Sequence, residues 1–184
     1  KEEVSELSDE HDWLNQQETN EGDDEVAAIA GRLNAGQKVA YDFVLAGSNI
    51  FITGSGGTGK TYLCNAIIKF LRSQYEADEI AITAMTGVAA ELLQGCTLHS
   101  QLGIGSSGLV DVVFGRMRIP TVRSLKVLII DEVSMVSGEF LDHLDNGFKR
   151  IRENPEPFGG IQLVLLGDFY QLPPITESTR SIAD

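Results

Sequence analysis

The chain has 184 residues, of which 42% are hydrophobic, and a formal net charge of −13. This length suits one domain with a buried core, and no apolar run approaches the ~20 residues that a membrane-spanning helix needs. The amino end lacks the apolar region of a signal peptide, and Cys64 and Cys96 suggest neither a metal site nor a disulfide framework, so we expect an intracellular protein with no membrane partner.

The acidic charge is concentrated at the start of the chain. Residues 1–25 hold eleven acidic side chains and one basic side chain, which leaves a net charge of only −3 on the remaining residues. We expect this segment to be a disordered acidic tail and the ordered domain to cover 26–184. Because salt screens such a tail from a groove more than ~8 Å away, the global charge neither proves nor excludes a DNA partner.

Helical and strand patterns alternate in the expected domain. Apolar residues at helical spacing, together with caps and glycine stops, predict helices over 26–32, from the N-cap Asn34 to Gly47, from Thr61 to about Tyr75, over 87–93 and over 138–152. Short apolar runs predict strands over 49–53, 80–83, 127–131 and 161–166, and the Gly- and Ser-rich residues 101–111 predict a loop. We therefore expect an α/β fold with an open parallel sheet, helices on both faces, and ligands at the carboxyl ends of the strands.

A phosphate-binding motif follows the strand over 49–53. The pattern G-x-x-x-x-G-K-[ST] is formed by Gly54, Ser55, Gly56, Gly57, Thr58, Gly59, Lys60 and Thr61. Its glycines permit left-handed backbone angles, so that successive N–H groups can turn inward on a phosphate. Lys60 supplies a charge for the β- and γ-phosphates, and the Thr61 hydroxyl can ligate Mg²⁺. The sequence therefore predicts a P-loop that binds a nucleoside triphosphate.

Polar residues at the ends of later strands complete the predicted site. Asp131 and Glu132 directly follow the strand over 127–131, where a P-loop enzyme places a Mg²⁺-binding acid and a residue that activates water. Gln171 follows the strand over 161–166 and is a candidate contact to the γ-phosphate or its water. Gln37, ahead of the P-loop strand, could pair with the edge of adenine, because its amide carries both donors and acceptors.

Five segments resemble one protein family. They are LNAGQ (33–37), GSGGTGKT (54–61), TAMTGVAAELLQGCTLHS (83–100), IIDEVSMV (129–136) and PFGGIQLVLLGDFYQLPP (157–174). Together they resemble the amino-terminal, RecA-like motor half (domain 1A) of a superfamily-one DNA helicase of the Pif type (petite integration frequency). The resemblance implies an ATP- and Mg²⁺-dependent motor that moves 5′ to 3′ on single-stranded DNA, unwinds duplexes and in some members resolves G-quadruplexes. It also implies roles in DNA repair, recombination and telomere maintenance, in the nucleus or mitochondrion of a eukaryote, and we expect a monomer.

The resemblance assigns roles to further residues. It implies that Gln37 reads adenine and that Gln171 links the γ-phosphate to the DNA groove. The residues that it implies for contact with the DNA backbone are Thr83, Thr86, Gly87, Val88, Gly95, Thr97, His99 and Ser100. Hydroxyl and N–H donors at helix starts suit this task, because they bind phosphate without reading the base sequence.

The sequence also departs from the family pattern. Ser55 stands where many relatives have proline or alanine, and Tyr170 stands where phenylalanine is common. The later helicase motifs, which carry arginines that reach across the nucleotide cleft, are absent from the sequence up to Asp184. Because such an arginine contributes ~10³–10⁵ in rate in related enzymes, we expect this chain alone to bind ATP weakly, to hydrolyse it slowly and not to unwind DNA.

Two other classes of function compete with a helicase motor. A GTPase should carry an N-K-x-D guanine reader, and a nucleotide kinase should carry an arginine-rich lid, and neither pattern is present. Strong preference for GTP, or phosphate transfer to a nucleoside monophosphate, would favour these enzymes. The second alternative is a truncated motor half that acts only as a nucleotide- or DNA-binding module.

Overall fold

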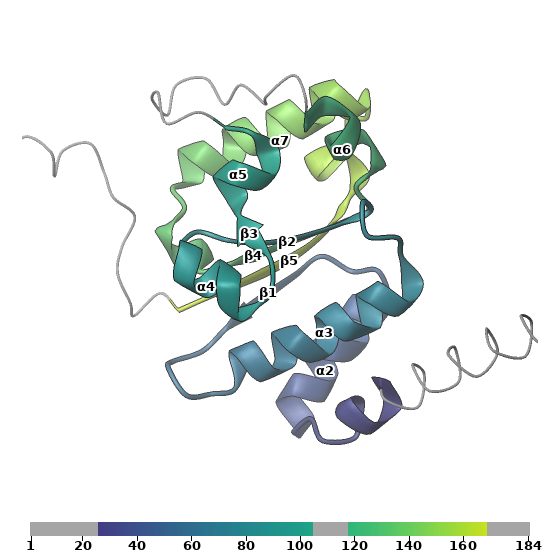
Figure 1. Cartoon of the computed structure of the whole chain (residues 1–184), viewed down its shortest axis with the longest axis vertical. Helices are drawn as coiled ribbons and strands as arrows, with labels where there is room; N and C mark the ends of the chain where they lie inside the picture. Colours follow the sequence, from purple (N-terminus) through teal and green to yellow (C-terminus); the bar gives the residue numbers. More distant parts are fainter. Residues whose placement is uncertain (1–25, 105–117, 169–184) are drawn as a thin grey trace, which may run out of the picture.

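A computed structural model describes residues 26–104 and 118–168 (Figure 1). A short helix over 26–30 comes first. The first half of the fold contains α2 (Ala35–Leu45), β1 (Ile50–Thr53), α3 (Lys60–Gln74), β2 (Ile80–Ala84), α4 (Gly87–Leu92), β3 (Cys96–Thr97) and α5 (Leu98–Leu102). The second half contains α6 (Ile119–Ser124), β4 (Val127–Asp131), the 3₁₀ helix η2 (Val133–Met135), α7 (Gly138–Arg152), the 3₁₀ helix η3 (Pro157–Gly160) and β5 (Gln162–Gly167).

The strands form one sheet in the order β1-β5-β4-β2-β3, and every neighbouring pair is parallel. Parallel strands place all their carboxyl ends at the same edge of the sheet. The P-loop after β1, Thr86 after β2, Glu132 after β4 and Asp168 after β5 therefore share this edge. The expected parallel α/β sheet is confirmed.

Helices cover both faces of the sheet. In β4, Val127 and Ile129 belong to a core cluster with α2 and α3, whereas Leu128 and Ile130 belong to a cluster with α5, α6 and α7. In Figure 1 these two sets of helices lie on opposite sides of the strands. Each fully buried aliphatic side chain contributes about 1.5–3 kcal/mol through burial. Alternate side chains of one continuous apolar run thus hold two helical layers on one sheet.

Hydrogen bonds from side chains fix the entry to β1. The Gln162 amide, nearly buried in β5, donates to the carbonyl oxygens of Val44 (2.9 Å) and Ser48 (3.0 Å), and Asn49 Oδ1 accepts from the Leu163 N–H (2.8 Å). Gly47 ends α2 in the left-handed conformation (φ 74°), as the sequence predicts. The strand that leads into the P-loop is therefore anchored at its start.

The loop predicted over 101–111 is partly wrong. Residues 98–102 form α5, because the Thr97 hydroxyl accepts from the Ser100 N–H (3.3 Å) and because Leu98 and Leu102 are fully buried one turn apart. Residues 105–111 lie outside the described residues, as do the predicted tail 1–25, Tyr170 and Gln171. None of the helices in the described ranges is both long and apolar enough to cross a membrane.

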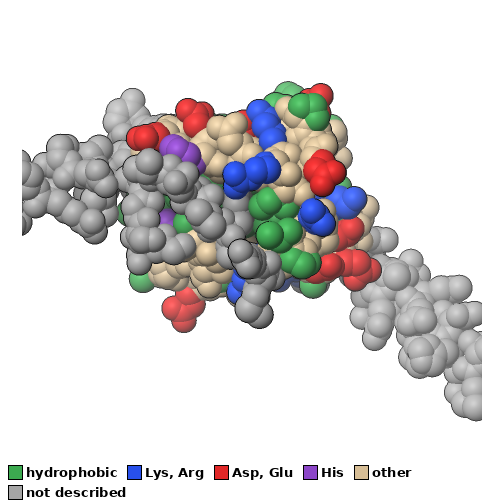
Figure 2. All heavy atoms as spheres, turned by 90° about the horizontal axis from the view of Figure 1, so that it is seen from above, with side chains coloured by type: hydrophobic (Ala, Val, Ile, Leu, Met, Phe, Trp, Pro, Cys, Tyr) green, Lys and Arg blue, Asp and Glu red, His purple; other side chains and the backbone are tan. Residues whose placement is uncertain are grey.

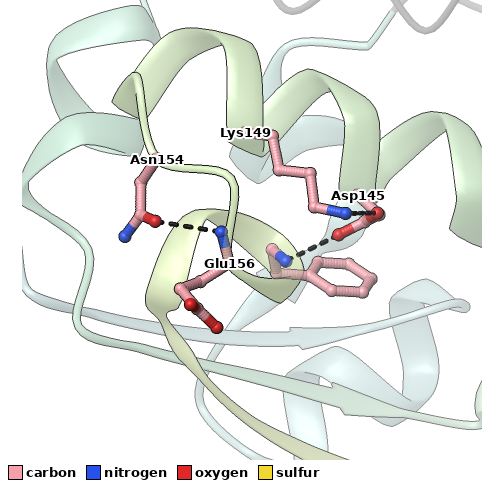
Figure 3. A network of polar contacts seen from close by, with 5 residues as sticks. Asp145, Lys149, Asn154 and Glu156 are labelled. Atoms are coloured by element: carbon pink, nitrogen blue, oxygen red, sulfur yellow. Dashed lines mark hydrogen bonds and ion pairs between the residues drawn. The ribbon is translucent and has the colours of Figure 1, made fainter.

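The outer face over α6 and α7 carries charges of both signs. Figure 2, which looks down on the top of Figure 1, shows basic side chains beside acidic and hydrophobic ones on the visible described surface. Figure 3 shows a polar network between α7 and η3, in which Asp145 accepts from Lys149 Nζ (2.6 Å) and from the N–H of Phe158 (2.6 Å). The contact with Lys149 lies within α7, and the contact with Phe158 joins α7 to η3, the segment that leads into β5.

Candidate functional site

The P-loop joins the end of β1 to the start of α3. Gly57 (φ 79°) and Gly59 (φ 83°) have left-handed backbone angles, which suit glycine. Gly59 is the N-cap of α3, and no described side chain caps this 15-residue helix there. The first N–H groups of α3 thus remain available to an anion, and the helix dipole favours negative charge at this end.

Lys60 folds back over the loop. Its Nζ donates to the carbonyl oxygens of Gly54 (2.5 Å) and Ser55 (3.1 Å), and the Thr58 hydroxyl donates to Ser55 O (2.9 Å). Thr61 is exposed at the first turn of α3, beside Lys60. The loop therefore holds its cation and a hydroxyl at the start of one helix, which is the donor set of a phosphate and Mg²⁺ site.

Asp131 ends β4 as a half-buried carboxylate. Its Oδ1 accepts from the N–H of Glu132 (2.8 Å). Burial raises the pKa of Asp131, and both this N–H and the Lys60 ammonium oppose that shift. Lys60 therefore acts electrostatically on Asp131, which supports the expected proximity of the P-loop lysine and the first acid.

Glu132 has a strained backbone. Its φ of 56° lies in the left-handed region, which is uncommon for a residue other than glycine and recurs at functional sites. Burial raises the pKa of Glu132, the neighbouring Asp131 and Asp168 raise it further, and Lys60 lowers it. The two predicted acids thus lie with Lys60 in one electrostatic cluster.

Asp168 belongs to this cluster, although it was not among the predicted site residues. It follows β5 and is only 3% exposed, and its effect on the Glu132 pKa places it near that carboxyl. The pairing of Thr53 with Gly167 sets Asp168 beside the root of the P-loop. An acidic residue directly after a buried strand is the signal that could have identified it.

Gln37 lies beside the P-loop, as its predicted role requires. It occupies the third position of α2, where its side chain and that of Asn34 form a reciprocal capping box. Its Nε2 also donates to the carbonyl oxygen of Gly59 (3.3 Å). The amide proposed to read adenine is thus placed across from the start of α3.

Two predicted DNA-contacting segments lie side by side. Thr86 is the N-cap of α4 and accepts from the Ala89 N–H (3.2 Å), and Thr97 is the N-cap of α5. The pairing of Ala84 with Thr97 brings these two helix starts together. Exposed Gly87 and Val88, the latter 74% exposed, complete the first segment. This arrangement suits the predicted contacts with phosphates, which remain a prediction.

Other predicted DNA contacts fit the structure less well. Thr83 is fully buried in β2 and its hydroxyl donates to Ile129 O (2.6 Å), so in this structure the side chain joins two strands, and its contact with DNA stays a prediction. At Gly95 a Cβ would overlap the Ile82 carbonyl oxygen. The close packing of this position against β2 therefore accounts for the glycine without a contact to DNA. The half-buried His99 ring stacks on Phe140 of α7, with ring centroids 5.4 Å apart. The ring therefore packs against α7, and its contact with DNA stays a prediction.

The Asp131 backbone connects the nucleotide site to the first of these segments. Its carbonyl oxygen accepts from the N–H of Met85 (3.2 Å), the residue before Thr86. Ala84 pairs with Asp131 in the sheet. The acid predicted to hold Mg²⁺ and the segment predicted to touch DNA are therefore joined by one hydrogen bond.

Comparisons with known proteins agree with this geometry. The family described as PIF1-like helicase matches residues 32–183. The chain is 48% identical over 136 residues to ATP-dependent DNA helicase RRM3 of Saccharomyces cerevisiae, covering 71% of this chain and 19% of that protein. It is 46% identical over 155 residues to ATP-dependent DNA helicase PIF1 of Xenopus laevis, covering 80% of this chain and 24% of that protein. The chain thus spans about a fifth to a quarter of the length of these relatives.

Solved structures show the same similarity. The crystal structure of Pif1 helicase from Candida albicans matches with a TM-score of 0.72 and 43% identity, over 80% of this chain and 35% of that chain. Pif1 helicase from Bacteroides in complex with ADP-AlF3 and ssDNA matches with a TM-score of 0.66 and 32% identity, over 82% of this chain and 35% of that chain. The fold, the order of its motifs and these matches lead to one conclusion: the chain belongs to the PIF1-like helicase family.

Proposed function

We propose that the protein containing this chain is an ATP-dependent DNA helicase that moves 5′ to 3′ on single-stranded DNA. The observation that carries the proposal is the meeting of Lys60, Asp131 and Glu132 at the sheet edge that also presents Thr86 and Thr97. The names of the relatives as ATP-dependent DNA helicases support it. So do related structures that contain ADP-AlF3, ssDNA or forked DNA.

The donor set suits a magnesium-bound triphosphate. The uncapped start of α3 and the left-handed glycines offer N–H groups, and Lys60 offers a positive charge. Thr61 and Asp131 would hold Mg²⁺, which would neutralise charge on the β- and γ-phosphates. Hard oxygen ligands such as these are the ones that Mg²⁺ prefers.

Each residue then has a separate task. Lys60 would exchange its bonds to Gly54 and Ser55 for bonds to phosphate oxygens. Glu132 would accept a proton from the attacking water, and its neighbours Asp131 and Asp168, by raising its pKa, would make it a better base. The hydrogen bond from Met85 to the Asp131 carbonyl supports a direct mechanical route from this site to the DNA segment.

The finer parts of the proposal concern partners and location. We propose that forked duplexes and G-quadruplex junctions are substrates, and that the protein acts in the nucleus or mitochondrion of a eukaryote. We also propose a monomer as the working unit, although in one related structure two coordinating Pif1 helicases unwind forked dsDNA. Sedimentation of the protein on forked DNA distinguishes one bound copy from two.

The test uses Glu132→Gln in the intact protein. We expect this variant to keep ATP binding and to lose DNA-stimulated hydrolysis, because the amide cannot accept the proton. Glu139→Gln, an exposed acid at the start of α7, is the matched control and should hydrolyse ATP like the wild type. Equal turnover by Glu132→Gln would refute the general-base role.

Polarity requires a second assay. Duplex DNA with a single-stranded tail at a 5′ end should be unwound, and the same duplex with its tail at a 3′ end should not. Unwinding from the 3′ tail alone would refute the direction of movement. DNA and ATP binding without turnover in the wild type would favour the alternative of a binding module.

A further inference from the structure

The Gln37 amide lies between two backbone groups of different segments. Its Oε1 accepts from the N–H of Asn34 (3.0 Å), and its Nε2 donates to the carbonyl oxygen of Gly59 (3.3 Å). The first partner is the N-cap of α2 and the second is the N-cap of α3. One side chain thus joins the starts of two helices that flank the nucleotide site.

These two partners determine which way the amide faces. A glutamine oxygen and nitrogen are nearly indistinguishable in shape, so their assignment depends on the hydrogen-bond network. A backbone N–H can only donate and a carbonyl oxygen can only accept. Asn34 therefore requires the oxygen on its side and Gly59 requires the nitrogen on its side, and both constraints select the same orientation.

The oriented amide keeps half of its bonding capacity. A glutamine amide has two N–H donors and two acceptor lone pairs, and each backbone contact uses one. One donor and one acceptor therefore remain on the Gln37 amide. Adenine presents a donor at N6 and an acceptor at N7 on one edge, which matches this pair, whereas guanine presents acceptors at both O6 and N7.

We propose that Asn34 is a positioning residue for nucleotide choice: its backbone N–H holds the Gln37 amide in the orientation that accepts adenine and opposes guanine. The inference rests on the proposed ATP site and adds how its selectivity arises. If the amide could turn freely, it could direct both N–H groups toward the acceptors of guanine. The contact with Asn34 opposes this turn, because it holds the oxygen in place.

Gly59 makes the close approach possible. A Cβ at this position would lie 2.6 Å from Gln37 Nε2, and the φ of 83° also disfavours any other residue. Asn34 itself has a φ of −70°, close to the value that proline imposes. Proline at position 34 would therefore remove the N–H while it preserves this backbone angle.

The experiment compares Asn34→Pro with Asn34→Ala in the intact protein. Both variants lose the side-chain cap that accepts from the Gln37 N–H, and only proline also loses the backbone donor. Affinities for AMP-PNP and GMP-PNP are measured by calorimetry with Mg²⁺, and thermal melting confirms folding. Since one net hydrogen bond is at stake, we expect the adenine-over-guanine ratio of Asn34→Pro to fall about five- to ten-fold below that of Asn34→Ala.

Hydrogen exchange of the Asn34 N–H in the wild type covers the case in which Asn34→Pro does not fold. This N–H donates to Gln37 Oε1, so its exchange should be slowed, and Mg²⁺ with AMP-PNP should slow it further than Mg²⁺ with GMP-PNP, because only adenine pairs with the amide in this orientation. The inference is overturned if Asn34→Pro and Asn34→Ala show the same ratio, or if AMP-PNP and GMP-PNP protect the Asn34 N–H equally. Wild-type protein that binds neither analogue would instead refute the proposed function, and the inference with it.

Discussion

We expect replacement of Arg152 to lower the free energy of unfolding by removing a defined set of hydrogen bonds. Its Nη1 donates to the carbonyl oxygens of Val122 (3.0 Å), Arg123 (2.8 Å) and Leu125 (2.8 Å), and its Nε donates to Gly159 O (2.8 Å). One guanidinium therefore joins the end of α6, the end of α7 and η3. Replacement with methionine preserves most of the apolar length and removes every one of these bonds.

The expected magnitude follows from the geometry. A hydrogen bond to a charged group contributes about 1.5–3 kcal/mol. Three carbonyls share one nitrogen of Arg152, and its bond to Arg123 O is exposed to water, so these contributions do not add. We expect Arg152→Met to lower the free energy of unfolding by about 2–4 kcal/mol, which corresponds to a fall in melting temperature of roughly 5–15 °C for a domain of this size.

Urea unfolding of the wild type and the variant measures this difference. Arg152→Lys should show an intermediate loss of stability. Lysine keeps the charge, but its single ammonium group cannot reach both Gly159 O and the carbonyl oxygens at the end of α6. Arg72→Met, at an exposed arginine of α3, is the control and should change stability by less than about 0.5 kcal/mol. A loss in Arg152→Met no larger than in this control would refute the reasoning. Below the unfolding transition, its affinity for ATP should equal that of the wild type, because its partners Leu125 and Gly159 precede β4 and β5, at the end of the parallel sheet opposite to the P-loop.

Three further predictions concern the fold and the site. Asp145→Ala leaves the Phe158 N–H without its acceptor and should cost about 1–3 kcal/mol, whereas Asp145→Asn keeps an acceptor and should cost less; equal losses in urea unfolding would contradict this. The pKa of Glu132 is raised by burial from its ordinary value of 4.5, so the folded protein keeps this proton to a higher pH than the unfolded chain does. Ionisation of Glu132 therefore lowers the free energy of unfolding as the pH rises. Glu132→Gln should therefore raise the melting temperature at pH ~7 and have little effect at pH ~3.5, and an equal effect at both values would contradict this. Gly95→Ala should destabilise the fold by about 1–3 kcal/mol because its Cβ would overlap a β2 carbonyl, whereas Gly87→Ala, with nothing near its Cβ, should cost less than about 0.5 kcal/mol, and similar melting temperatures would contradict this.

The sheet and its nucleotide edge could be predicted because their signals are local. The P-loop has a fixed spacing, and the run Val127–Asp131 is apolar enough to indicate a strand buried on both faces. Asn34 was predicted as an N-cap from its residue type and position, and the structure confirms it. Each of these features depends on a few consecutive residues.

The features that the sequence missed depend on distant residues. The strand β3 has two residues and exists only through its pairing with β2. Thr83 looked like a polar contact residue, but its hydroxyl bonds to Ile129, which is 46 positions away. The partner of the His99 ring, Phe140, comes from α7. Residue type alone could not reveal these contacts, because three-dimensional packing determines them.

The central claim is that the P-loop of this chain binds and turns over ATP to drive a DNA motor. Its most direct test is DNA-stimulated ATP hydrolysis by the intact protein with and without Lys60→Ala. We predict that the variant loses most of its nucleotide affinity and nearly all of its turnover and unwinding, because the charge that Gly54 and Ser55 hold inside the loop is removed. Wild-type affinity and turnover in Lys60→Ala would contradict the account.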